Sequence, residues 1–242
     1  MPEGPGRVIE VQRLGGADSA FLDRAYIACS PDLVPLPGQY VMASAAPGPI
    51  EQPASAALLP EAVFLGAGPP GIGELQTAGF WTGPPIPGPW RPRQTLALRG
   101  PLGRGFELPR DISRLALVRA GRTAGCLPAL AQSAAASRLS VVYFGEIGDQ
   151  GILPPAVEMY PLEALPDLAD WAEYLAVEVT LEEFNGLDQL PGLLDRNPPI
   201  RMDVLVRAPM PCGALGKCGV CALRRGREWL LACEDGPVIR LK

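Results

Sequence analysis

The feature that most constrains this chain is a group of four cysteines near its C-terminus. Cys212, Cys218, Cys221 and Cys233 lie within 22 residues, with the spacing C-x5-C-x2-C-x11-C. The segment from Ala208 onward has too few apolar residues to form a hydrophobic core of its own. We therefore expect bonds made by the cysteines to hold this segment together.

The spacing of these cysteines favours a [2Fe-2S] cluster. Plant-type clusters use C-x4-C-x2-C with a distant fourth cysteine, and the first gap here is one residue longer. Glycines between the cysteines permit positive φ angles, which would bring backbone N–H groups close to the cluster sulfurs. The stretch CALRRGREWLLAC predicts two short strands turning at residues 225–227, which would return Cys233 to a position beside Cys221. We predict that all four cysteines are ligands.

Zinc binding and disulfide formation remain open as alternative roles of the four cysteines. Zinc also binds C-x2-C pairs, although zinc ribbons use two such pairs and here Cys212 and Cys233 stand alone. A disulfide framework is typical of secreted proteins, whereas the first residues show no secretion-signal pattern and we expect a cytoplasmic location. The remaining cysteines, Cys29 and Cys126, are predicted to be small buried residues rather than ligands.

The rest of the chain divides into two patterns. Residues 1–109 contain short β-rich runs separated by Pro and Gly turns, which predicts a small antiparallel β-barrel with an irregular excursion over residues 66–92. Residues 110–208 alternate apolar runs with helix-like stretches, which predicts a parallel α/β layer. Residues 209–242 would form the cluster module. The expected fold class is therefore a β-barrel plus an α/β domain with a C-terminal [2Fe-2S] module.

Composition excludes several classes of function. The chain contains no histidine, so His-based catalytic triads, His-ligated zinc and Rieske-type ligation are excluded. A net charge of −5 provides no basic surface for nucleic acid. Apolar runs are far shorter than a membrane span, so no transmembrane helix is expected.

Three motifs carry a family resemblance that covers essentially the whole chain. The cysteine tail, GPLGRGF at Gly100–Phe106 and PGQYV at Pro37–Val41 resemble the electron-transfer subunit of dihydroorotate dehydrogenase, in the ferredoxin-reductase-like group. The resemblance implies an FAD-binding barrel, a nucleotide-binding α/β domain and a C-terminal [2Fe-2S] module. It also implies a partner, an FMN-type catalytic subunit in a hetero-oligomer, and a role in pyrimidine biosynthesis. The GPLG segment either is a tight turn that leaves a barrel strand or lies on the flavin side, with Gly100, Pro101, Leu102 and Gly103 near the flavin.

The sequence departs from the family pattern where FAD is expected to bind. Members have an arginine-containing stretch soon after PGQ[FY]V, and its guanidinium meets the FAD diphosphate. Here no Lys or Arg occurs between Arg24 and Arg91. We therefore predict that FAD is not bound by the usual route.

A second departure lies at the turn where the family binds a nucleotide. A GGGIG-like turn normally lets a pyrophosphate approach a helix N-terminus. In this chain Ala120, Arg122 and Thr123 stand among Gly121 and Gly125, and the C-G-P motif expected after the last strand is absent. We therefore predict that NAD(P) does not bind.

The leading hypothesis is a [2Fe-2S] subunit that relays electrons to or from a flavoprotein and does not catalyse a reaction alone. One alternative is an intact NAD(P)H-dependent FAD/[2Fe-2S] reductase with divergent motifs. Another is a zinc-stabilised interaction subunit without catalytic activity.

Overall fold

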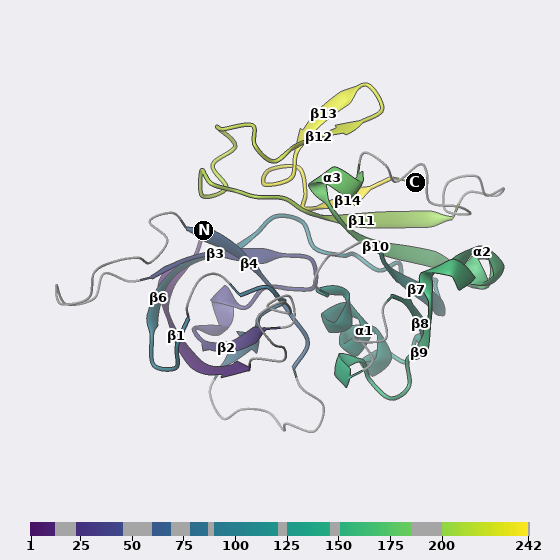
Figure 1. The fold of residues 1–242 in the computed structure, drawn as a ribbon, viewed down its shortest axis with the longest axis horizontal. Helices are drawn as coiled ribbons and strands as arrows, with labels where there is room; N and C mark the ends of the chain where they lie inside the picture. The colour runs from purple at the N-terminus through teal and green to yellow at the C-terminus, as the bar shows by residue number, and fades with distance from the viewer. Residues whose placement is uncertain are drawn as a thin grey trace.

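The structure, a computed structural model, consists of two β-sheets side by side with a small module resting on both (Figure 1). It describes residues 1–12, 23–45, 60–68, 78–86, 90–120, 125–145, 151–184 and 200–241. Among these residues the longest helix has 10 residues, and no helix is long and apolar enough to cross a membrane.

The first sheet is antiparallel and curls into a barrel. Its strands are β1 (Glu3–Gln12), β2 (Arg24–Ala28), β3 (Tyr40–Ala45), β4 (Glu61–Phe64), β5 (Gly79–Trp81) and β6 (Thr95–Leu102), in the order β4-β3-β6-β1-β2-β5. The two edge strands meet just beyond their ends, where Leu65 and Thr82 form an antiparallel bridge. The predicted barrel is thus confirmed. Strand β5 lies within the stretch expected to be irregular, and its aromatic residues Phe80 and Trp81 are buried.

The second sheet is mostly parallel, as the alternating pattern predicted. It contains β7 (Arg114–Arg119), β8 (Ser140–Phe144), β9 (Glu158–Tyr160), β10 (Tyr174–Thr180), β11 (Arg201–Arg207) and β14 (Val238–Arg240), in the order β14-β11-β10-β7-β8-β9. Among the described strands of this second sheet, only β14 runs antiparallel to its neighbour. The helices are α1 (Leu127–Ala136), α2 (Leu165–Leu168) and α3 (Leu181–Phe184).

The two faces of the second sheet pack against different parts of the molecule. On β10, Tyr174 and Ala176 belong to the apolar cluster that contains α1, whereas Leu175 and Val177 belong to the cluster that contains the cysteine module. Side chains of successive strand residues point to opposite faces. The side chain of Glu178 therefore lies on the same face of the sheet as Tyr174 and Ala176, which is the face that packs against α1.

The cysteine module is a loop followed by the hairpin β12 (Ala222–Arg225) and β13 (Glu228–Leu231). The hairpin turns where the sequence predicted, with Arg225 opposite Glu228. One apolar core contains residues of the barrel, the second sheet and the module, among them Tyr40, Val204 and Leu223. Domain boundaries at residues 109 and 208 stay a prediction, because this core and strand β14 continue across them.

Candidate metal centre

The four predicted ligands come from the module's loop and the two ends of its hairpin. Cys212 and Cys218 lie in the loop after β11, Cys221 immediately precedes β12, and Cys233 follows β13. The hairpin brings the Sγ atoms of Cys221 and Cys233 to 3.3 Å from each other. The return of Cys233 to Cys221 is therefore observed.

Cys212 is surrounded by hydrogen-bond donors. The backbone N–H groups of Leu215 and Lys217 donate to its sulfur and lower the pKa of Cys212 to about 6, and the Cys218 thiol also donates to it. The thiolate is the form of cysteine that binds a metal. The loop is therefore folded to hold negative charge on this sulfur.

Cys233 has a different environment, because it lies in the interior. Burial and, next, the neighbouring Cys221 together raise the pKa of Cys233 to about 12, and the backbone N–H of Gly216 opposes the rise. Gly216 has a φ of +66°, which orients its N–H toward this sulfur and which L residues rarely adopt. The loop glycines adopt the positive φ angles that the sequence suggested, and one of them, Gly216, directs its N–H at a cysteine sulfur.

The sulfur atoms lie in two pairs, Cys212 with Cys218 and Cys221 with Cys233. Two thiolates on one tetrahedral metal ion with bonds of about 2.3 Å are about 3.8 Å apart, close to the separation of the second pair. Within the described ranges, no three His, Cys, Asp or Glu side chains are grouped as ligands of a single ion. Four thiols in two pairs, with amide donors directed at one sulfur of each pair, fit an iron–sulfur cluster.

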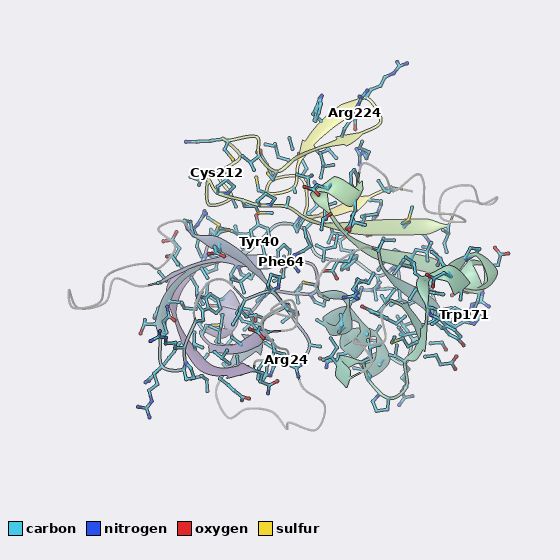
Figure 2. All side chains as sticks on the ribbon, viewed as in Figure 1. Arg24, Tyr40, Phe64, Trp171, Cys212 and Arg224 are labelled. Carbon is cyan, nitrogen blue, oxygen red and sulfur yellow. The ribbon has the colours of Figure 1, made fainter. Side chains whose placement is uncertain are left out.

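Barrel residues hold the module in place. The Tyr40 hydroxyl donates to the carbonyl of Cys233 at 3.2 Å, and the Arg99 guanidinium donates to the carbonyl of Gly213. Figure 2 shows Cys212 on the module above Tyr40, near the junction of the barrel with the second sheet.

The GPLGRGF segment also contacts the module. A Cβ atom on Gly103 would lie 2.4 Å from the Pro237 ring and 2.7 Å from the carbonyl oxygen of Gly236, so the backbone approaches closely here. Gly100, Pro101 and Leu102 form the end of β6 beside β3. Flavin contact by Gly100 to Gly103 stays a prediction.

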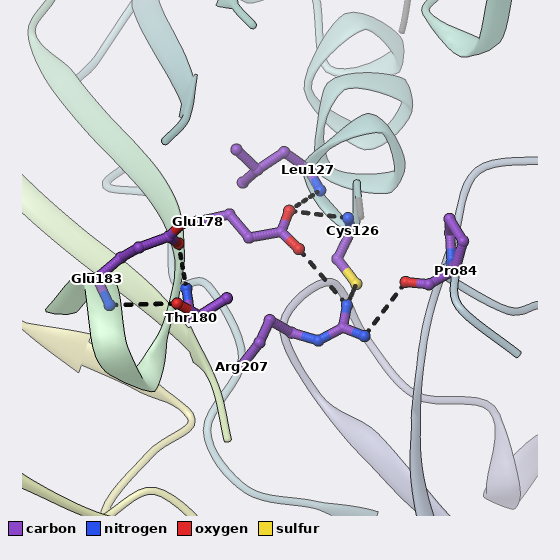
Figure 3. A network of polar contacts seen from close by, with 7 residues as sticks. All are labelled: Pro84, Cys126, Leu127, Glu178, Thr180, Glu183 and Arg207. Carbon is purple, nitrogen blue, oxygen red and sulfur yellow. Dashed lines mark hydrogen bonds and ion pairs between the residues drawn. The ribbon is translucent and has the colours of Figure 1, made fainter. Parts of the chain in front are cut away.

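Apart from the metal centre, the start of α1 contains a network that the sequence did not lead us to expect. The buried carboxylate of Glu178 accepts hydrogen bonds from the backbone N–H groups of Cys126 at 2.8 Å and Leu127 at 3.2 Å (Figure 3). Burial raises the pKa of Glu178, and the Arg207 guanidinium and these amides oppose the rise. The sequence feature that could have revealed this network is a glutamate, Glu178, inside the apolar run YLAVEVT.

Arg207 lies where β11 ends and completes the network. Its Nη1 is 3.5 Å from Glu178 Oε1 and 2.6 Å from Cys126 Sγ, and its Nη2 donates to the Pro84 carbonyl at 3.2 Å. The guanidinium carbon also lies 4.3 Å from the centre of the Phe64 ring on β4. Arg207 therefore connects the second sheet to the barrel.

The structure describes only some residues of the predicted nucleotide turn, and it describes both of the remaining cysteines. Ala120 is buried and its N–H donates to the carbonyl of Glu178, whereas Gly121, Arg122 and Thr123 lie outside the described residues. Cys126 is buried, as predicted, and Cys29 is half-buried, with its pKa raised by burial to about 11.

Comparisons with known proteins agree with this architecture. Residues 208–242 match the family model for the iron-sulfur cluster binding domain of dihydroorotate dehydrogenase B. A solved structure of an NADH-dependent reduced ferredoxin-NADP oxidoreductase is 15% identical, covering 97% of this chain and 87% of its own, with a TM-score of 0.64. A solved structure of the ferredoxin reductase in carbazole 1,9a-dioxygenase is 14% identical, and the match covers 84% of this chain and 68% of that one, with a TM-score of 0.55. No curated protein sequence matches the chain.

These likenesses show that the chain has a ferredoxin-reductase-like fold. Its C-terminal segment, residues 208–242, is similar to the iron-sulfur cluster binding domain of dihydroorotate dehydrogenase B, and this match supports an iron–sulfur cluster as the cofactor. The resemblance to the electron-transfer subunit of dihydroorotate dehydrogenase is confirmed.

Proposed function

We propose that this chain is a [2Fe-2S] subunit that passes electrons to or from a flavoprotein, of the kind represented by the catalytic subunit of dihydroorotate dehydrogenase. The observation that carries the proposal is the arrangement of four thiols in two pairs, on a segment of iron–sulfur-binding type. Two irons with two cysteine ligands each would match the two pairs.

The chain's own residues would bind the cluster and control its charge. Cys212, Cys218, Cys221 and Cys233 supply the ligands. The N–H groups of Leu215 and Lys217 at Cys212, and of Gly216 at Cys233, would stabilise negative charge on sulfur, and such hydrogen bonds are one determinant of reduction potential. When bound, a [2Fe-2S] cluster accepts and returns one electron at a time.

The surface around Cys218 supports a protein partner. Leu215 and Val220 flank the exposed Cys218 in the sequence and are 56% and 46% exposed, and Trp229 on the hairpin is 71% exposed. Exposed apolar residues next to a redox centre in the chain, as Leu215 and Val220 are, are suited to a contact that excludes water, and an exposed tryptophan on the hairpin of the same module is of the residue type enriched at the centres of such contacts. We propose this surface as the flavoprotein contact, in a cytoplasmic hetero-oligomer.

Anaerobic purification of the full chain tests the cofactor. We expect two irons and two acid-labile sulfides per chain, and a paramagnetic resonance signal of a reduced [2Fe-2S] cluster after dithionite. Zinc without sulfide would replace the proposal with a zinc-stabilised interaction subunit. Stoichiometric flavin that survives purification, together with NADH oxidation by the chain alone, would favour an intact reductase.

A pair of matched variants tests the contact surface. Val220→Asp should slow cluster reduction by a purified FMN-containing dihydroorotate dehydrogenase catalytic subunit at least tenfold, without changing the resonance signal. Ile9→Asp is the control, because Ile9 is 42% exposed but lies on the barrel strand β1. Equal rates for the two variants would show that the surface around Cys218 is not the contact.

A further inference from the structure

We propose that Glu178 is a built-in substitute for the pyrophosphate of a dinucleotide, and that this chain carries a latent anion-binding site which its own carboxylate fills. The site is at the N-terminus of α1 and includes none of the cysteines of the metal centre. The inference therefore goes beyond the electron-transfer role and does not depend on it.

The location is the one where α/β folds of this type bind phosphates. In open parallel sheets, ligands bind beyond the carboxyl ends of the strands, and a pyrophosphate sits against the N-terminus of the helix that follows the first strand. Here that helix is α1, which follows β7, and β10 lies next to β7 in the sheet. The Glu178 carboxylate reaches this helix end because its position on β10 faces α1.

Every backbone position in the first turn of α1 is accounted for. The N–H groups of Cys126 and Leu127 donate to Glu178, Pro128 has no N–H, and the N–H of Ala129 donates to the carbonyl of Cys126. The first amides of a helix have no partner within the helix and are what a bound phosphate normally uses. In this chain they are already occupied by a carboxylate that is 0% exposed.

The cation that pairs with this carboxylate, Arg207, also contacts residues of the barrel. Arg207 pairs with Glu178, packs over Phe64 of β4 and donates to the carbonyl of Pro84, with only 16% of its side chain exposed. The barrel also approaches the start of α1 directly, since a Cβ atom on Gly83 would lie 2.6 Å from Cys126 Sγ. Arg207 and the close approach of Gly83 thus connect the barrel to the start of α1.

Glu178→Ala should uncover the site. The variant loses the carboxylate but keeps the two amides and Arg207, so we expect it to bind inorganic pyrophosphate at least tenfold more tightly than the wild type in calorimetry. At pyrophosphate concentrations of 100 times Kd, the thermal midpoint of the variant should rise by roughly 5 °C or more. The wild type should show neither effect.

Glu173→Ala is the matched control. Glu173 also accepts backbone N–H bonds, from Ser113 at 2.6 Å and Arg114 at 3.1 Å, and pairs with an arginine at 3.2 Å. These amides belong to the start of a strand rather than to a helix N-terminus, so this variant should gain no pyrophosphate affinity. An equal gain in both variants would show a general effect of lost negative charge and would overturn the proposal.

Glu178→Gln covers the case in which Glu178→Ala does not fold. It keeps the side-chain volume and removes the charge that excludes an incoming anion, so it should also gain pyrophosphate affinity. The proposal is wrong if a folded Glu178 variant binds pyrophosphate no better than the wild type, or if the wild type binds NADH with a micromolar Kd. Iron content and the resonance signal of the same samples report on the metal centre alone. A failure of the proposed electron-transfer function can therefore be distinguished from a failure of the anion-site proposal.

Discussion

The loop of the metal centre and the start of α1 are built from the same chemical group, a set of backbone N–H donors directed at one point, but the two regions use it differently. In the loop, the amides of Leu215 and Lys217 converge on a cysteine sulfur. At α1, the amides of Cys126 and Leu127 converge on the carboxylate of Glu178. Donors directed at a proposed metal ligand leave that sulfur available to a cofactor, whereas the donors at α1 are satisfied by the chain's own carboxylate, as we propose for a filled anion site.

The comparison also separates two kinds of charge balance. The negative charge at the loop would be shared with iron, which the chain does not supply. The negative charge at α1 is balanced within the chain, by Arg207 and two amides. Removing a residue should therefore have different consequences in the two regions: loss of cofactor at the first, and loss of stability at the second.

The largest effect is expected for Cys218→Ser. Because Cys218 is one of the four proposed ligands, we expect loss of cluster assembly, measured as iron and sulfide per chain and as the reduced resonance signal. Cys29→Ser is the control, since Cys29 lies in the barrel and its pKa is raised by burial to about 11. A Cys218→Ser protein with full iron content would contradict the ligand assignment.

Arg207→Ala should have the largest effect on stability. It leaves the fully buried Glu178 carboxylate without its cation, which we expect to lower the free energy of unfolding by about 3 kcal/mol in urea titrations. The double variant Arg207→Ala/Glu178→Gln should recover part of this loss, because no uncompensated charge remains. Arg201→Ala breaks the exposed pair with Asp111 and should have a much smaller effect; equal losses would contradict a special role for the buried pair.

The sequence predicted the metal centre better than the start of α1, and the reason is physical. Cysteine spacing limits which sulfurs can meet, so the hairpin turn near residues 225–227 and the approach of Cys233 to Cys221 followed from the sequence, whereas the role of the four cysteines as ligands stays a prediction. Glu178 and Arg207 are 29 residues apart and meet only when β10 and β11 pair. Strands β5, β9 and β14 have three residues each, too few for a recognisable alternation, and their pairing depends on the rest of the sheet.

Gly216→Val tests whether the loop amides are needed for the cluster. The φ of +66° disfavours a β-branched residue by at least about 1–2 kcal/mol, and a Cβ atom would lie 2.8 Å from Glu234 Oε2. We expect reduced iron content and faster iron release to a chelator. Gly226→Val is matched in φ, at +61°, but a Cβ atom there meets nothing within 4 Å, and the residue is at the hairpin turn. Equal iron retention in both variants would show that the loop geometry is unimportant.

Tyr40→Phe should have the smallest effect, and it tests whether the barrel supports the metal centre. The Tyr40 hydroxyl is the donor to the carbonyl of Cys233, and the ring is fully buried in the core that the barrel shares with the module. Removing the hydroxyl leaves this carbonyl without that donor at a cost of about 1 kcal/mol, while the packing of the ring is kept. Iron release should therefore begin at a lower urea concentration than in the wild type, with the iron content in buffer unchanged. Tyr160→Phe removes a hydroxyl that donates to an exposed carboxylate, that of Glu158, and should leave iron release as it is in the wild type. If Tyr40→Phe also releases iron at the wild-type urea concentration, the module does not depend on the barrel through this bond, and the Arg99 contact with Gly213 becomes the next connection to test.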